Sequence, residues 1–249
     1  MRSRIKLFRR VWKIVRGTSK VKFFFVVLAK VVLRIQVPAT YTVSVDGQTA
    51  QLFLRGTVND FDFLASIWEG EYDVALDEPK LILDLGAHVG IASIWFLLKY
   101  PGVTVEAYEP SPELFPILAK NLSQFGRRAV AHQVAASHDG RMDLFLADEF
   151  NTTMTSTAFK PTNKRITVPS RSLDTIVGDR IVDLLKIDIE GSEYELFLHA
   201  HCLPHIRAIT GELHSGAYPN KVNDDIFKLL TPFHIIEKSD AIFVSRAHV

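Results

Sequence analysis

Short apolar runs alternate with segments of helical spacing over most of the chain after residue 80. Continuous apolar runs of this length are typical of strands buried on both faces of a parallel sheet. The runs that we predict as strands lie at 81–83, 103–108, 129–135, 182–187 and 206–211. Because helix-like segments separate them, the pattern predicts a parallel sheet with helices on both faces.

Two more strand-like runs close the chain, at 233–237 and 241–245. Only Lys238, Ser239 and Asp240 separate them, and so short a link makes neighbouring strands antiparallel. The pattern after residue 80 therefore predicts an α/β fold with a seven-stranded, mostly parallel sheet and an antiparallel C-terminal strand.

Two segments modify this regular alternation. Between 141 and 169, strand-like MDLFLAD and RITVPS flank a polar stretch, which predicts an inserted hairpin with a long loop. Ser111 and Pro112 are residue types typical of the N-cap and first position of a helix, and we predict a helix from here to Gly126. Pro116 should distort the first turns of this helix.

The residues ahead of the sheet predict a small added unit over 38–79. Asp46-Gly47 stands between two β-prone runs, which is a strong hairpin signal. Asn59 or Asp60 could cap the helix that follows, and Gly70 should end it. We expect the main domain to occupy 80–249.

Residues 1–37 form a basic N-terminal extension. Apolar residues recur at helical spacing in 5–15 among Arg and Lys, and the apolar stretch 23–35 is shorter than the roughly 20 residues that a membrane span needs. No small-x-small cleavage pattern follows it, which disfavours a secretory signal. Two interpretations stay open: an anchor that lies on a membrane surface or docks a partner, and a helix packed on the domain.

Composition narrows the class of protein. The 249 residues are 47% hydrophobic, which suits one globular domain with extensions. Eleven of the 29 Lys and Arg lie in residues 1–34, so 18 basic residues face 28 acidic ones in the rest, a balance that disfavours a nucleic-acid partner. The single cysteine, Cys202, excludes an intrachain disulfide and favours a reducing compartment. We expect a cytoplasmic protein, with peripheral membrane association through 1–37 as the alternative.

The sequence KLILDLGAHVG at 80–90 has the character of a ligand-binding turn. A buried strand ends in Asp84, glycines follow, and a helix begins near Ile91. Glycine allows close approach of backbone to ligand, and a helix N-terminus offers unpaired N–H groups. The spacing Gly86-x-x-x-Gly90 is neither the dinucleotide fingerprint nor the phosphate loop. Glu109, at the end of the next strand, is placed where an acid can accept hydrogen bonds from ribose hydroxyls.

The turn resembles motif I of the class I S-adenosylmethionine-dependent methyltransferases. Downstream, VPSRSLDTI at 168–176, VDLLKIDIEGSEYELF at 182–197 and GELH at 211–214 resemble the FkbM family of methyltransferases, and KIDIEG-x-E is the most specific string. The resemblance spans roughly residues 40–245 and departs at His88, where asparagine is expected. It implies a Rossmann-like sheet and methyl transfer from S-adenosylmethionine to an oxygen of a sugar or other small hydroxylated metabolite.

The resemblance also implies where the cofactor lies. The turn should meet the methionine part, with Asp84 oriented toward its amino group or a bridging water, Glu109 should hold the ribose, and 134–137 should lie near the adenine. The candidate cofactor residues are Asp84, Gly86, Ala87, His88, Gly90, Glu109, Ser111, Ala135 and Ala136.

Polar residues at two adjacent strand ends are the candidates for catalysis. They are Lys186, Asp188, Glu190, Glu193, Glu212 and His214. A base must take the proton of the acceptor hydroxyl, and we favour Asp188 or His214, with Glu190 and Glu212 holding a small-molecule or glycan acceptor. Lys186 could instead pair with a carboxylate, and Glu193 could be a surface charge.

Three alternatives stay open at this stage. An oxygen-rich cluster of this kind could bind Mg²⁺ or Ca²⁺, although we do not predict a metal. A non-catalytic S-adenosylmethionine-binding protein would carry the same turn. A nicotinamide-dependent oxidoreductase would share the alternation but should show G-x-G-x-x-G, which the sequence lacks.

Overall fold

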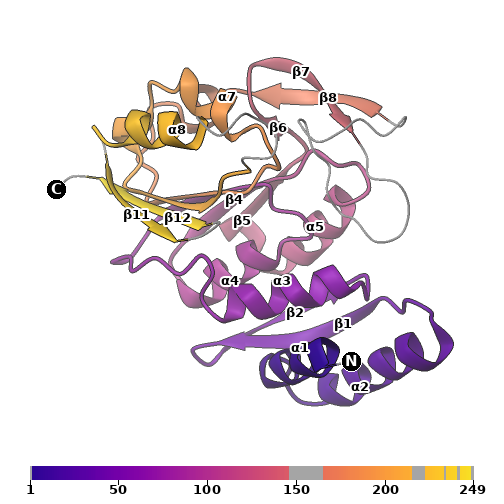
Figure 1. Ribbon diagram of the computed structural model, residues 1–249. Helices are drawn as coiled ribbons and strands as arrows, with labels where there is room; N and C mark the ends of the chain where they lie inside the picture. The colour runs from indigo at the N-terminus through magenta and orange to yellow at the C-terminus, as the bar shows by residue number, and fades with distance from the viewer. Residues whose placement is uncertain (1, 146–164, 215–221, 233, 240–241, 248–249) are drawn as a thin grey trace.

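The computed structural model describes residues 2–145, 165–214, 222–232, 234–239 and 242–247. Figure 1 shows successive layers, with the N-terminal helices at one end and the C-terminal elements at the other. The predicted loop within 146–164 lies outside the described residues.

Five parallel strands form the centre of the main sheet, which confirms the predicted parallel α/β core. They are β3 (Leu81–Leu85), β4 (Thr104–Tyr108), β5 (Ala129–His132), β9 (Leu184–Ile187) and β10 (Ala208–Glu212), in the order β10-β9-β3-β4-β5. All four residues of β9 are buried, as expected for a strand covered on both faces. Beyond β10 lie β12 (Ile242–Ala247) and β11 (His234–Ser239), each antiparallel to its neighbour.

Helices cover both faces of this sheet. They are α4 (Ile91–Lys99), α5 (Phe115–Leu122), α6 (Leu173–Val177), α7 (Glu193–Leu198) and α8 (Val222–Leu230), with short 3₁₀ segments at Ser123–Arg128 and Leu203–His205. The prediction that a helix begins at Pro112 was wrong, because α5 begins at Phe115. Pro116 therefore lies in the first turn, where its missing N–H costs nothing, and it does not interrupt the helix.

A separate small sheet stands beside the main one. It contains β6 (Ala135–Ala136), β7 (Gly140–Phe145) and β8 (Arg165–Arg171), in the order β6-β8-β7. β7 and β8 pair antiparallel, which confirms the inserted hairpin. The predicted strand 129–135 was too long, because the chain leaves the main sheet after His132 and Ala135 pairs with Ser170 of β8.

The predicted hairpin and helix precede the main sheet. β1 (Ala39–Val45) and β2 (Gln48–Leu54) pair through a two-residue turn whose residues Asp46 and Gly47 both have positive φ, at 48° and 82°. Helix α3 (Val58–Trp68) follows. Its cap is Thr57, whose hydroxyl accepts from the Asp60 N–H at 3.0 Å, and not Asn59 or Asp60 as predicted.

Residues 2–33 form helices that pack on this hairpin and on α3. α1 (Arg2–Ile14) and α2 (Ser19–Leu28) are followed by the π-helical turn η1 (Ala29–Leu33). Val11, Val15 and Phe23 are buried in the same hydrophobic cluster as hairpin and sheet residues. Within the described residues, no helix is long and apolar enough to cross a membrane.

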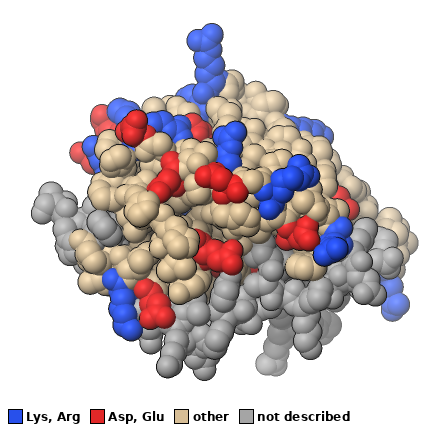
Figure 2. Space-filling view, turned by 90° about the horizontal axis from the view of Figure 1, so that it is seen from above, with Lys and Arg blue, Asp and Glu red and all other residues tan. Residues whose placement is uncertain are grey.

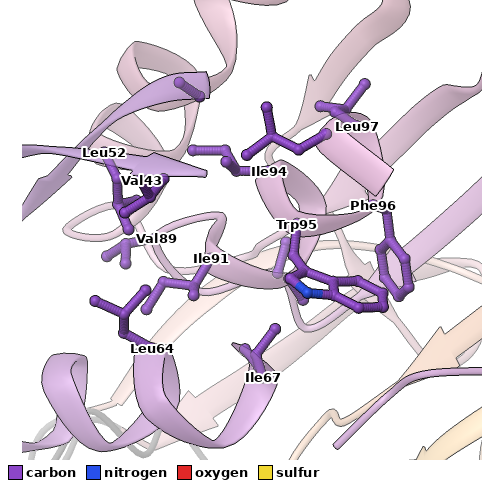
Figure 3. Packing of buried hydrophobic residues seen from close by; sticks show 14 of the residues in the cluster. Val43, Leu52, Leu64, Ile67, Val89, Ile91, Ile94, Trp95, Phe96 and Leu97 are labelled. Carbon is purple, nitrogen blue, oxygen red and sulfur yellow. The ribbon is translucent and has the colours of Figure 1, made fainter. Parts of the chain in front are cut away.

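Helix α4 is the centre of that cluster. Figure 3 shows Ile94 of α4 on the side of the hairpin residues Val43 and Leu52, and Ile91 on the side of the α3 residue Leu64. Because α4 also starts at the glycine turn after β3, the hairpin and α3 are packed directly against the element that positions the candidate cofactor site.

Candidate active site

The turn between β3 and α4 holds two glycines in conformations that other residues disfavour. Gly86 has φ of 77° and Gly90, the residue before α4, has φ of 87°. A Cβ at Gly86 would overlap the carbonyl oxygen of Asp188. The N–H groups of Gly86 and Ala87 donate to the carbonyl of Tyr108 at 3.0 and 2.9 Å, which fixes the turn against β4.

Asp84 lies behind this turn and is fully buried. Its carboxylate accepts from the Ser93 hydroxyl at 2.6 Å and lies 3.1 Å from Nζ of Lys186. Asp84 is absent from the residues that line the cavity described below, so its contacts stabilise the turn from inside the protein.

Lys186 is a buried cation held by fixed acceptors. Its Nζ donates to the carbonyl of Gly86 at 2.8 Å and lies 3.9 Å from the carboxylate of Asp188. Burial would lower the pKa of Lys186, but the carboxylates of Asp84 and Asp188 outweigh burial and raise it. Lys186 therefore stays protonated and ties the two strand ends together, as the ion-pair alternative predicted.

Glu109 faces the turn from the end of β4. Its two carboxylate oxygens accept from the N–H groups of His88 and Ser111, both at 2.9 Å. Burial raises the pKa of Glu109 to about 7, although these N–H groups oppose the shift. Ser111 itself is buried, and its hydroxyl accepts from the N–H groups of Glu113 and Leu114, so its visible role is to cap the following turn.

His88 is held by residues from the added hairpin and α3. Nη2 of Arg55 lies 2.9 Å from Nε2 of His88, and Arg55 also pairs with the buried Asp60. A guanidinium can only donate, so Nε2 is the acceptor and the neutral ring carries its proton on Nδ1. Burial, followed by the charge of Arg55, lowers the pKa of His88 to about 4. The ring of Phe63 packs edge-on against it at 5.3 Å.

A cavity joins the glycine turn to the end of β9. Its lining includes the candidate cofactor residues Gly86, Ala87, His88, Glu109, Ala135 and Ala136 and the candidate catalytic residues Lys186, Asp188 and Glu190. Gly90 and Ser111 do not line it, and neither do Glu212 and His214.

His214 stands at the centre of a cluster of carboxylates next to this cavity. Its Nδ1 donates to Glu193 at 2.9 Å, and its Nε2 lies 3.3 Å from Glu190, 3.5 Å from Glu212 and 3.8 Å from Asp188. Burial would lower the pKa of His214, but the bond to Glu193 and the nearby carboxylates raise it to about 9. His214 is therefore cationic at neutral pH.

Burial and neighbouring charges also raise the pKa values of two carboxyl groups in the cluster. Burial raises the pKa of Glu190 to about 7, and burial followed by the charge of Asp188 raises that of Glu212. Glu193 is 2% exposed and also accepts from the N–H groups of Ile189 and Gly191, so the alternative of a surface charge was wrong.

Asp188, Glu190 and His214 bring one ligand atom each within 4.8 Å of one another, which is close enough to hold a cation. Binding through His214 would require the loss of a proton whose pKa is about 9. A metal held there would have to displace this proton, so its binding should strengthen as pH rises.

Comparison with known proteins shows the family of this chain. The family model described as the methyltransferase FkbM domain matches residues 84–237. The chain belongs to the FkbM methyltransferase family. The cofactor turn, Glu109 and the His214 cluster all lie within the matched range.

Two curated relatives are similar over part of their length. "Methyltransferase 1" of Beauveria bassiana is 26% identical over 150 residues, which are 50% of this chain and 60% of that protein. The 31-O-demethyl-FK506 methyltransferase FkbM of Streptomyces tacrolimicus is 32% identical over 117 residues, 47% of this chain and 38% of that protein. This chain thus matches less than two thirds of either relative.

Among solved structures, a fibrillarin/Nop5p complex has a TM-score of 0.46 and 16% identity, over 83% of this chain and 96% of that one. A precorrin-6y C5,15-methyltransferase from Geobacter metallireducens has a TM-score of 0.43 and 12% identity, over 82% and 94% of the two chains.

Several residues of this FkbM-family site were not predicted as functional. Tyr72 is buried, and its hydroxyl donates to Asp188 at 3.1 Å. Phe63 and Ile67 of α3 and Met142 and Leu144 of β7 line the cavity. Glu71, beside Tyr72, has a pKa raised to about 7 by burial and by the charges of Glu212 and Asp188. The run Gly70-Glu71-Tyr72-Asp73 ahead of motif I is the signal that could have indicated Glu71 and Tyr72.

Proposed function

We propose that this protein transfers a methyl group from S-adenosylmethionine to an oxygen of a sugar or other small hydroxylated metabolite. One observation carries the proposal. The residues suited to the cofactor, among them Gly86 and Glu109, and the carboxylate suited to accept a proton, Asp188, line the same cavity.

The residues present fit S-adenosylmethionine. Gly86 and Ala87 offer a turn without bulky side chains, and Glu109 is a buried carboxylate that accepts one N–H on each oxygen, which leaves lone pairs for two ribose hydroxyls. Ala135 and Ala136 offer a flat apolar wall for the adenine. Bound there, the cofactor supplies an electrophilic methyl group on a sulfonium.

We assign the base to Asp188 in preference to His214. A base must be unprotonated, and the raised pKa of His214 makes it a proton donor at neutral pH. Asp188 lines the cavity, and Tyr72 fixes its Oδ2 by a hydrogen bond. Its Oδ1 lies 3.8 Å from Nε2 of His214, so the positive charge of the imidazolium helps to hold the Asp188 side chain in place.

The acidic surroundings suit an acceptor with several hydroxyl groups. Glu71, Glu190 and Glu212 add carboxylates around Asp188, and carboxylates accept hydrogen bonds from hydroxyls. The same charge would repel the phosphates of a nucleic acid. The name of the curated relative from Streptomyces tacrolimicus, 31-O-demethyl-FK506 methyltransferase, describes methyl transfer to an oxygen, which supports oxygen as the acceptor atom.

Calorimetry tests the cofactor assignment first. We expect the protein to bind S-adenosylmethionine and not NAD, and the reverse result would favour an oxidoreductase. Labelled S-adenosylmethionine should then transfer its methyl group to members of a panel of glycans, glycolipids and small alcohols. Cofactor binding with no transfer to any member, under conditions where a known methyltransferase is active, would favour the non-catalytic binding protein.

A further inference from the structure

The outward face of α2 is apolar, although a helix on the surface of a domain usually exposes polar residues. Val21, Phe24, Phe25 and Leu28 are between 44% and 60% exposed. Fourteen large hydrophobic side chains are exposed in the described part of the chain, and eight of them lie between residues 21 and 35. These eight are the four on α2, three in η1 and Ile35. So dense a set of exposed apolar side chains marks an interaction surface.

This face belongs to a helix that is firmly attached. On its inner side, Phe23 is 1% exposed and packs edge-on against Tyr41 and Phe61. The Ser19 hydroxyl accepts from the N–H of Thr42 at 2.9 Å. Since the inner face is already filled with apolar contacts, the outer residues cannot be buried by turning the helix over.

Positive charge surrounds the apolar face. No Asp or Glu occurs before Asp46, whereas residues 1–34 contain eleven Lys and Arg. At about 100° per residue, Lys20 and Lys22 fall on opposite edges of the strip formed by Val21, Phe24 and Leu28. On the face opposite the N-terminal helices, by contrast, the described residues show Lys and Arg interspersed with Asp and Glu (Figure 2).

An apolar groove continues this face toward the hairpin. Val21, Phe25 and Ala29 line one side of it, and Pro38 and Phe53 line the other. Lys22 and Lys120 also line the groove, which contains no acidic residue. The apolar and basic characters of the outer face thus extend onto the β1–β2 hairpin.

We propose that the outer face of α2 and η1 docks on an anionic lipid bilayer. Phe24, Phe25 and Leu28 enter the boundary between headgroups and acyl chains, and the lysines at the edges meet lipid phosphates. A second copy of the chain would set one basic surface against another, which like-charge repulsion opposes. The inference does not depend on the methyl-transfer proposal, because none of these residues lines the cavity of the candidate active site.

Vesicle flotation tests the docking surface with the full chain. We expect recovery with vesicles of phosphatidylcholine and phosphatidylglycerol, weaker recovery with phosphatidylcholine alone, and partial release by salt. The double variant Phe24→Gln/Phe25→Gln should bind anionic vesicles about tenfold less tightly or worse. The matched control Val130→Gln/Ile181→Gln also removes two exposed apolar side chains, 40% and 51% exposed, and should bind like the unmodified protein.

Three results would overturn the proposal. The unmodified protein could fail to float with anionic vesicles, or the two double variants could bind them equally. Sedimentation velocity could also show that the unmodified protein is a dimer that Phe24→Gln/Phe25→Gln dissolves, in which case a second copy covers the face. Near-UV circular dichroism of both variants establishes that the comparison is between folded proteins.

Discussion

Nδ1 of His214 donates a hydrogen bond to the carboxylate of Glu193 at 2.9 Å, and Glu193 is only 2% exposed. The bond fixes which nitrogen faces Glu193 and turns Nε2 toward Glu190, Glu212 and Asp188. One imidazolium thereby offsets the repulsion among several carboxylates at the end of the sheet. A cluster that would otherwise be unstable can remain close to the cavity.

The first prediction concerns stability and pH. The pKa of His214 in the folded protein, about 9, lies above its ordinary 6.5, so its contribution is fully present below pH 6.5 and is lost as pH rises through 9. We expect His214→Gln to be less stable than the unmodified protein by about 1–2 kcal/mol at pH 6, since the group is partly screened by solvent. The difference should shrink between pH 6.5 and 9.

Denaturant unfolding at several pH values measures this difference. His199→Gln, which replaces an exposed histidine, is the matched control and should show no such trend. A difference for His214→Gln that stays constant from pH 6 to 9 would contradict a cationic His214 stabilised by its carboxylates.

The second prediction concerns the glycine turn. Gly86→Ala should weaken binding of S-adenosylmethionine by about tenfold or more and lower stability by about 1–3 kcal/mol, because φ of 77° and the overlap with the Asp188 carbonyl both oppose a side chain. Gly102→Ala is the control, since a Cβ there meets no atom within 4 Å. Calorimetry and thermal unfolding measure the two effects, and equal results for both variants would mean that the turn tolerates a side chain.

The third prediction concerns Glu109. Its pKa of about 7 means that it gains a proton as pH falls from 8 to 6, and a neutral carboxyl holds ribose hydroxyls less well. We expect the affinity for S-adenosylmethionine to fall about tenfold over this range, following the ionised fraction. Glu109→Gln should bind weakly and with little dependence on pH. A variant that keeps the steep dependence would assign the titration to another group.

The fourth prediction concerns metal removal. Because His214 holds its proton up to about pH 9, the cluster of Asp188, Glu190 and His214 should bind Mg²⁺ weakly at pH 7. Methyl transfer should therefore survive treatment with a chelator. Loss of transfer that added Mg²⁺ restores would show instead that the cluster works as a cation site.

Particular residues show how far the sequence could be interpreted. Asp46-Gly47 predicted its hairpin correctly because the turn depends on local backbone conformation. Asp84, Glu109 and Asp188 were placed at one edge because parallel strands bring their carboxyl ends together. Tyr72 was not predicted as a site residue, since its contact with Asp188 joins positions 116 residues apart. The charge of His214 likewise depends on burial and on distances to four carboxylates, which spacing along the chain does not give.

Boundaries were less predictable than elements, for local reasons. Thr57 caps α3 although Asn59 and Asp60 are equally good capping types, because the side chain of Asp60 is already engaged by Arg55. The division into 1–37, 38–79 and 80–249 stays a prediction, and Val11, Leu52 and Ile94 from these three parts lie in one hydrophobic cluster.

The last prediction concerns the base. Asp188→Asn should reduce the rate of methyl transfer by about 10²–10⁴-fold, because an amide cannot take the proton of the acceptor hydroxyl. Affinity for S-adenosylmethionine should change little, since the turn and Glu109 remain intact. Tyr72→Phe, which removes only the hydrogen bond to Oδ2 of Asp188, should have a smaller effect on rate.

Asp179→Asn changes an exposed acid and serves as the control for charge. Labelled methyl transfer and calorimetry, performed on the same preparations, separate rate from binding. If Asp188→Asn turns over normally while His214→Gln is inactive, the base is His214 in a minor neutral state. The raised pKa would then require the rate to increase with pH up to about 9.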